Sequence, residues 1–467
     1  MLVQSDPVKS KPNDEIEFPS TREAFFIWLK IGLLSFGGPA GQIAMMHRVL
    51  VEEKRWISEE RFLHALNYVM LLPGPEAQQL ATYAGWLLHR TRGGIIAGGL
   101  FILPGALVML TLTILYAGFR DFSFVEAFFF GIKAAVLAIV IQAVVRIGSR
   151  ALPNKFMVLI ALLAFVGIFF FTIPFPLIIC GAALTGFVYS FLAPHSIAIA
   201  QSESTAPSSG PKYAVDVRID AGALTHIQPS LPRSVRIVFW GVTLWLAPVL
   251  IIMALLGPEH IYSQESFFFS KMAVVTFGGA YSVLAYVAQQ AVEFYGWLGP
   301  GEMLHGLGLA ETTPGPLIMV VQYVGFLAAF RNPGEIDPFI AGTIGAFLTT
   351  WVTFIPCFLW IFLGAPYIER LRNNRFVTAA LKAITAAVVG VVLYVAVWFG
   401  LHVCFENIHE FRFDYIRLLV PDWPTFEPGV LLITLAALIA ALKYKADMFM
   451  VIGASAVLGI LYFYMII

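Results

Sequence analysis

Polar residues in this chain lie in short clusters that separate long apolar runs. Most of these runs are about 17 to 25 residues long, the length that a helix needs to cross the hydrocarbon core of a bilayer. The pattern therefore predicts an all-α polytopic membrane protein with about 13 transmembrane helices. The candidate spans are residues 23–47, 61–88, 94–118, 124–147, 156–172, 174–193, 234–256, 267–290, 303–330, 340–363, 377–402, 428–442 and 447–466.

One long polar segment divides the spans into two groups. Residues 194–233 are rich in Ser, Pro and charged side chains, as expected for an aqueous linker. The first 22 residues are polar and lack the apolar core of a secretory signal, so we expect a cytosolic N-terminal tail. The predicted spans place the segment 38–60 on the outer side, yet it is basic, which the positive-inside rule disfavours. We therefore expect a partly re-entrant or interfacial helix there, and the number of spans in this region stays open.

The two groups of spans are copies of one unit. Adding 241 to the residue numbers aligns 30–75 with 271–316, and 14 of these 46 positions are identical without a gap. The matches include Trp56 with Trp297 and His64 with His305. We expect a first repeat over 23–193 and a second over 267–466.

The span at 234–256 has no counterpart in the first repeat. A single extra crossing makes the second copy enter the membrane from the opposite side, so we expect inverted repeats. Inverted repeats with broken helices are a recurring plan of secondary transporters, which bind substrate near the midplane.

Each copy carries two helix-breaking elements at matched positions. Proline removes a backbone donor and glycine frees the backbone, so Pro-Gly-Pro inside a span splits it into two half-helices. The half-helix after each break presents free N–H groups and a positive dipole end, which together suit an oxyanion. The alternative is that these residues only kink helices or let them pack closely. The elements are Gly37-Gly38 and Pro73-Gly74-Pro75 in the first copy, and Gly278-Gly279 and Pro314-Gly315-Pro316 in the second.

Charged residues inside the spans are candidates for the transport chemistry, because each is costly at the bilayer centre. Lys30 and Lys271 are equivalent positions, six residues or about 9 Å before the Phe-Gly-Gly element at helical rise. We expect them to compensate an anionic substrate, with snorkelling to the interface as the alternative for Lys30. Lys133 and Lys382 form a second equivalent pair.

Two carboxylates lie next to the Pro-Gly-Pro breaks. Glu76 follows the first break directly, and Glu311 lies three residues before the second. Either carboxylate could cap a half-helix or could carry a coupling proton. Gln79 and Thr313 are neutral hydrogen-bonding groups that could line the same site.

Composition and motifs argue against other classes of function. With 59% hydrophobic residues and zero net charge, the chain gives no support to a nucleic-acid partner. It contains no phosphate-binding loop, and its three cysteines lack metal-site spacing. We therefore expect no enzymatic activity, no cofactor and no metal.

Three stretches resemble the chromate ion transporter family, specifically its long, two-domain members: "SFGGPAGQIAMMHRVLVEEKRW", "LLPGPEAQQLATYAGW" and "GLAETTPGPLIMVVQYVGF". The resemblance covers nearly the whole chain apart from the N-terminal tail and the central linker. It implies a multi-pass protein of the bacterial inner (plasma) membrane that exports chromate, using the membrane potential or the proton gradient. Family members are described with antiparallel halves.

The family's signature elements fall on positions in both copies. One departure is the sequence Glu76-Ala77-Gln78, where other branches place small hydroxyl residues after the first Pro-Gly-Pro. The signature positions are Phe36, Gly37, Gly38, Pro39, Trp56, Pro73, Gly74, Pro75, Gln79 and Gly85 in the first copy, and Gly278, Gly279, Pro314, Gly315 and Pro316 in the second.

The expected function is secondary transport of a tetrahedral oxyanion, most simply chromate, by alternating access. Transport of sulfate or another oxyanion is the alternative within this class, and an anion channel is the alternative outside it. The sequence leaves open the direction of transport, the coupling ion, proton coupling and homo-oligomer formation.

Overall fold

The computed structural model describes residues 18–192 apart from Gly37 and Leu71, residues 213–275, 284, 286–367, 375–414 and 416–466. The described part of the chain is helical as predicted, with one antiparallel hairpin that the apolar pattern did not indicate. The elements are α1 (Thr21–Leu34), α2 (Gly38–His47), η1 (Arg48–Glu53), α3 (Glu59–Val69), α4 (Glu76–Phe119), α5 (Ser123–Ala151), α6 (Lys155–Phe169), α7 (Phe175–Leu192), α8 (Ala214–Asp220), η4 (Thr225–Ile227), α9 (Leu231–Leu256), α10 (Ile261–Val275), η5 (Gln289–Phe294), α12 (Pro300–Thr312), η6 (Leu317–Met319), α13 (Val320–Arg331), α14 (Pro338–Gly364), η7 (Ala365–Tyr367), α16 (Arg375–Cys404), β1 (Ile408–Phe413), β2 (Ile416–Pro421), η8 (Trp423–Thr425), α17 (Pro428–Leu442) and α18 (Met448–Ile466).

Within the described residues, six helices are long and apolar enough to cross a membrane, and four shorter apolar helices accompany them. This confirms a helical, multi-pass membrane protein, while the count of 13 spans stays a prediction. The six are Glu76–Phe119, Ser123–Ser149, Leu231–Leu256, Pro338–Tyr367, Ala379–Cys404 and Met448–Met465, and the four are Lys155–Phe169, Phe175–Phe191, Leu317–Arg331 and Pro428–Leu442.

The internal repeat is reproduced in the backbone. The π-helical turns η1 and η5 are 241 residues apart, and each is followed by a residue with positive φ, Arg55 at 50° and Gly296 at 63°. The next backbone N–H closes the turn in both copies: that of Trp56 donates to Leu50 and that of Trp297 donates to Ala291, each at 2.8 Å. The same sequence spacing therefore gives the same local fold twice.

A helical hairpin follows the Pro-Gly-Pro break in each copy. In the first copy α4 reverses at His89 and Arg90, so that a Cβ added to Gly85 would lie only 2.4 Å from the carbonyl oxygen of Gly93. In the second copy α13 and α14 form the hairpin, and Gly325 approaches Gly345 in the same way. Small residues let the helix backbones approach closely, a common device in membrane bundles.

The copies exchange helices with each other. Helix α5 of the first copy packs against α17 and α18 of the second, and α16 of the second packs against α6 and α7 of the first. We call these six helices the exchange bundle. Helices α1–α4, α10 and α12–α14 form the break bundle, which contains both Pro-Gly-Pro elements, and α9 packs on α10 and α14 of this bundle.

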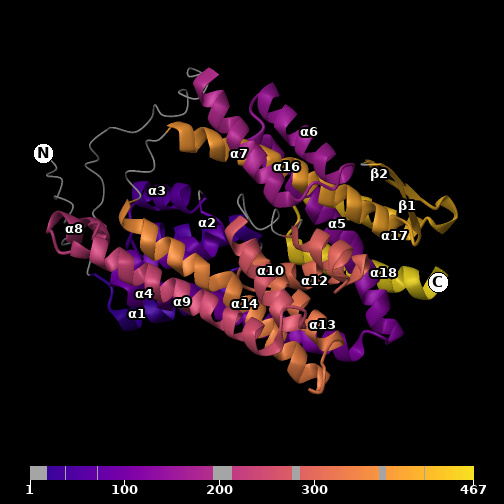
Figure 1. Cartoon of the computed structure of the whole chain (residues 1–467), viewed down its shortest axis with the longest axis horizontal. Helices are drawn as coiled ribbons and strands as arrows, with labels where there is room; N and C mark the ends of the chain where they lie inside the picture. Colours follow the sequence, from indigo (N-terminus) through magenta and orange to yellow (C-terminus); the bar gives the residue numbers. More distant parts are fainter. Residues whose placement is uncertain are drawn as a thin grey trace, which may run out of the picture.

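Figure 1 shows α6, α7, α16 and α17 along the upper edge of the molecule and α1, α9, α14 and α13 along the lower edge. Helix α12 contacts α4 and α13 on one side and α5 and α16 on the other, so it lies at the boundary between the two bundles.

Candidate functional site

Both Pro-Gly-Pro elements are buried breaks between helices. Gly74 and Gly315 adopt φ angles of 118° and 86°, in the left-handed region that favours glycine. The first break separates α3 from α4, whose N-cap is Pro75, and the second separates α12 from η6 and α13. The prediction that a helix ends and another begins at each element is therefore confirmed, while the membrane spans at 61–88 and 303–330 stay a prediction.

The second break is hydrogen-bonded to the first copy. The N–H of Gly315 donates to the carbonyl oxygen of Ser35 (2.8 Å), at the end of α1. The side-chain amide of Gln42 in α2 donates to the carbonyl oxygen of Gly315 (2.6 Å). The segment that carries Ser35 and Gly38 thus meets the Pro-Gly-Pro element of the other copy. Gly37, Gly278 and Gly279 lie outside the described residues.

Each break packs on a helix of the other copy: the second break packs on α4, and the first break packs on α14. A Cβ on Gly105 of α4 would lie 2.3 Å from the carbonyl oxygen of Pro314. A Cβ on Gly74 would lie 2.9 Å from the Sγ of Cys357 in α14. Helices α4 and α14 contact each other, so one helix pair supports both breaks.

Buried amide side chains surround the breaks. Gln79 donates to the carbonyl oxygen of Pro73 (2.7 Å), and Gln78 donates to Thr82 Oγ1 (3.0 Å). The Oε1 atoms of Gln42, Gln78 and Gln79 are buried and have no hydrogen-bond partner within the described part of the chain. Such atoms are costly unless water or a ligand satisfies them, and amide groups can rotate to offer N–H instead.

The half-helix after the first break begins without a side-chain cap. Pro75 is its N-cap residue and makes no capping hydrogen bond from its side chain. The first N–H groups of a helix have no intrahelical acceptor, and they carry the positive end of the helix dipole. At the second break, Thr313 directly precedes Pro314, and its hydroxyl donates to the carbonyl oxygen of Ala310 at the end of α12 (2.9 Å).

The predicted coupling carboxylates both lie beside the breaks. Glu76 is the first residue of α4, and Glu311 is a buried residue in the last turn of α12. Sequence reasoning missed Glu265 in α10, which is fully buried and whose two carboxylate oxygens have no hydrogen-bond partner among the described residues. A Cβ on Gly345 would lie 3.1 Å from Glu265 Oε2, so this carboxylate lies at the α13–α14 hairpin.

Lys30 and Lys271 are exposed residues on α1 and α10. No hydrogen bond or ion pair joins either side chain to a break in the part of the chain that the structure describes. The exposure of Lys30 agrees with the snorkelling alternative for this residue, and compensation of an anion by the two lysines stays a prediction. Gln42 and Ser35, by contrast, contact the second break and were not predicted; the only sequence signal was their position around the Gly-Gly element.

A family model described as chromate transporter matches residues 22–187 and 264–460, one region in each copy. A chromate transport protein of Pseudomonas aeruginosa is 33% identical over 378 residues, which cover 79% of this chain and 79% of that protein. A chromate transport protein of Cupriavidus metallidurans is 26% identical and covers 79% and 80%, and a probable chromate transport protein of Synechococcus elongatus is 25% identical and covers 88% and 92%. No solved structure matches the chain.

Proposed function

Because this chain belongs to the chromate transporter family, we propose that it is a secondary active transporter that exports chromate from the cytoplasm. The proposed energy source is the membrane potential or the proton gradient. Transport follows alternating access around an oxyanion site near the membrane midplane.

The observation that carries this proposal is the hydrogen bonding between Gly315, Ser35 and Gln42. It brings the break of one copy into contact with the broken segment of the other, as a shared site requires. A broken helix inside a membrane is stable only where it is buried in protein or lines a cavity. Both breaks are buried, and unsatisfied amide side chains lie around them.

In the proposed site, the anion is held by backbone N–H groups and neutral amides rather than by a ring of charges. Gln79 and the first turn of α4 supply donors from the first copy, and the turn after Pro316 supplies them from the second. The Thr313 hydroxyl has one proton, so it donates to the anion only after it turns away from Ala310. The proposed binding residues are Gly37, Gly38, Pro73, Gly74, Pro75, Gln79, Gly278, Gly279, Thr313, Pro314, Gly315 and Pro316, with Lys30 and Lys271 as compensating charges.

Alternating access needs two bodies that move against each other. We propose that the break bundle carries the substrate and that the exchange bundle is the frame, with residues 23–193 and 267–466 as inverted repeats. The crossing at 234–256, which is most of α9, inverts the second copy. Residues 1–22 form a cytosolic tail and 194–233 a polar linker.

Proton coupling is proposed to use Glu76 or Glu311, and we add Glu265 to these two. A carboxylate in a dry site is stable when protonated and can release the proton when water reaches it. Each Glu→Gln variant removes the exchangeable proton and keeps the shape, so the coupling residue is the one whose replacement makes chromate transport independent of the pH gradient.

Everted membrane vesicles test the function directly. Energised vesicles that contain the protein should accumulate chromate, and excess sulfate in the medium shows by competition whether the site separates the two anions. Accumulation no higher than in vesicles without the protein would reject the proposal. Conductance far above the rate of a conformational cycle would favour a channel instead.

A separate variant tests the two lysines. Replacing both Lys30 and Lys271 with Ala should abolish accumulation if they compensate the anion. Unchanged accumulation, with the same amount of protein in the membrane, would remove both residues from the site and leave the backbone and amide site in place.

A further inference from the structure

Glu265 is a carboxylate in the interior of the break bundle that its neighbours leave unsatisfied. It is the fifth residue of α10 and is fully buried. Neither of its carboxylate oxygens has a hydrogen-bond partner within the described part of the chain. A Cβ added to Gly345 would lie 3.1 Å from Glu265 Oε2 and 2.5 Å from the carbonyl oxygen of Gly325, so the carboxylate lies where α13 and α14 cross.

The other titratable side chains of the helices around Glu265 are engaged or lie elsewhere. Helix α10 packs on α9, α13 and α14. Lys271 is exposed, and the two arginines of α9 lie in its first two turns, at the end away from α10. Tyr262 donates to the carbonyl oxygen of Ala341 (3.2 Å). The set is Arg233 and Arg236 on α9, Tyr262 and Lys271 on α10, Tyr323 and Arg331 on α13, and Cys357 on α14.

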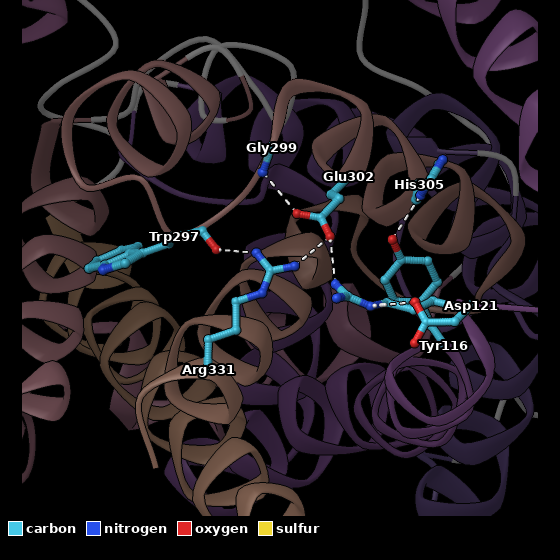
Figure 2. Close-up of polar contacts among 8 residues, drawn as sticks. Tyr116, Asp121, Trp297, Gly299, Glu302, His305 and Arg331 are labelled. Carbon is cyan, nitrogen blue, oxygen red and sulfur yellow. Dashed lines mark hydrogen bonds and ion pairs between the residues drawn. The ribbon is translucent and has the colours of Figure 1, made fainter. Parts of the chain in front are cut away.

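Helix α13 directs its two titratable groups toward α12 and the turn before it. A Cβ on Gly306 of α12 would lie 2.4 Å from the Tyr323 ring. Arg331 donates to the carbonyl oxygen of Trp297 (2.7 Å) and pairs with Glu302, as Figure 2 shows. Glu265 therefore has no counter-ion among the described residues. An ionised carboxylate in such a place is costly, so the packed structure favours the neutral, protonated acid.

A row of polar side chains on α14 leads from this carboxylate to the first break. Positions 345, 349, 353 and 357 are four residues apart, so they form one row along the helix surface. Thr349 and Thr353 are buried, and Thr353 Oγ1 has no hydrogen-bond partner among the described residues. Cys357 ends the row at the first break, since a Cβ on Gly74 would lie 2.9 Å from its Sγ. The row is about 18 Å long at helical rise.

The matching row of the first copy is apolar. The contact between Gly85 and Gly93 in the first copy recurs between Gly325 and Gly345 in the second, which aligns the two rows. The buried residues Ala24, Ala97 and Phe101 of the first copy then occupy the positions of Glu265, Thr349 and Thr353. Apolar side chains thus pack the same helices in the first copy, so packing alone does not require the polar ones.

We propose that Glu265 is the residue that binds the coupling proton, and that the row on α14 is the path by which water reaches it from the first break. The inference rests on the proposed function and selects one of the three carboxylates named there. Thr349 and Thr353 are about 6 Å apart along the helix, a gap that one water molecule with two hydrogen bonds bridges. Both hydroxyls are positioning residues that hold this water.

The proton then controls the packing of α10. Protonated Glu265 is neutral and lets α10 pack on the α13–α14 hairpin, whereas the ionised form needs water and separates the helices. Helix α14 contacts both Glu265 and the first break, so this separation reaches the substrate site. In each cycle Glu265 takes one proton from water while the site is open to one side and returns one proton to water while it is open to the other.

The test compares two measurements in everted vesicles: chromate accumulation driven by a pH gradient alone, and chromate exchange without a gradient. Glu265→Gln should lose accumulation and keep exchange, because the amide carries no transferable proton. Thr353→Val keeps the shape and removes the hydroxyl, so it should slow accumulation about five- to ten-fold, the effect of one lost hydrogen bond. Thr353→Ser should keep the rate.

Two variants near these positions are matched controls and should leave both measurements unchanged. Glu335→Gln removes an exposed carboxylate in the α13–α14 turn. Thr350→Val removes a hydroxyl of α14 that lies outside the row and donates to the carbonyl oxygen of Ala346 (2.7 Å). Undiminished accumulation by Glu265→Gln would overturn the proposal, as would equal rates of Thr353→Ser and Thr353→Val. Accumulation that follows a sodium gradient instead of the pH gradient would overturn it as well.

A chemical label decides the proton site without transport. Dicyclohexylcarbodiimide reacts with protonated carboxyl groups in apolar surroundings, and mass spectrometry locates the adduct on the unsubstituted protein. Labelling at residue 265 that declines as the pH rises supports the proposal, and its absence there overturns it, even if Glu265→Gln fails to reach the membrane. If the unsubstituted protein moves no chromate, the proposed function fails, and the label still decides whether Glu265 binds a proton.

Discussion

A single methyl group at Gly105 tests whether the two copies must meet closely at the second break. The Cβ of Gly105→Ala would lie 2.3 Å from the carbonyl oxygen of Pro314 and 3.5 Å from Gly315 Cα. Non-bonded atoms need about 3.5 Å, so the break must move by about 1 Å, and overpacking of this kind costs about 1–3 kcal/mol. The neighbours are backbone atoms, which cannot rotate away, and Gly315 is also held by Ser35.

If that cost falls on the substrate-bound state, the apparent affinity for chromate drops about 5- to 140-fold, since 1.4 kcal/mol is a factor of ten. Gly99→Ala is the matched control on the same helix, because a Cβ there meets no atom within 4 Å. It should leave transport unchanged and can stabilise the helix by about 0.5–1 kcal/mol. Chromate uptake into everted vesicles and thermal stability in detergent measure the two effects. Equal behaviour of the two variants in both assays would refute the proposed packing of the site.

Three further changes test other parts of the structure. Gln42→Met removes the donor to Gly315 and should destabilise the protein by about 1–3 kcal/mol, because a buried carbonyl loses its partner; an unchanged unfolding midpoint would contradict this. Glu302→Gln should lower the free energy of unfolding by about 1–3 kcal/mol, because the carboxylate is only 20% exposed and pairs with two guanidinium groups. Glu410, which pairs with Arg412 in the exposed hairpin, is the control: Glu410→Gln should lower it by under about 1 kcal/mol in the same denaturation assay. Burial lowers the pKa of His226, which bonds to the carbonyl oxygen of Trp86, so the neutral imidazole favours the folded state. The stability that the neutral His226 contributes is complete above the unfolded pKa of about 6.5 and is lost as the pH falls below it. Hydrogen exchange in residues 214–230 should therefore speed up at acidic pH, and His226→Gln should remove this pH dependence.

The breaks were predictable because proline and glycine act locally. Pro73 and Pro75 remove donors wherever the chain places them, and the spacing of 241 residues showed that the device occurs twice. The π-helical turn at Arg48–Glu53 had no such signal, since its residues are ordinary helix formers. The hairpin at Ile408–Pro421 was also missed, because a search for apolar runs does not detect short strands with exposed side chains.

The environment of single side chains was the least predictable part of the site. A helix that is apolar on all sides has no periodicity to show which face is buried, so the sequence could not tell that Lys30 is exposed and Glu265 buried. The partner of Gln42 lies 273 residues away, and no local pattern encodes that contact. Contacts between the two copies depend on the tertiary fold. The repeat in the sequence shows that two copies exist, but it does not show which of their residues meet.

In the proposed transport mechanism, the packing of helices across the copies makes the pair of copies the unit that binds substrate. The second break is held by Ser35 and Gln42 of the first copy, and α5 and α16 each pack on helices of the opposite copy, so neither copy alone contains all of these contacts. Duplication supplies nearly the same backbone at the two ends, but the side chains have diverged: Glu302 with two guanidinium groups occupies the position that Arg61 has in the first copy. In the proposed inverted arrangement this difference lies across the membrane, so the two sides of the protein present different charged groups. Under the proposed mechanism, the gradient sets the direction of net transport, and a difference between the copies can change only how tightly each side holds the anion.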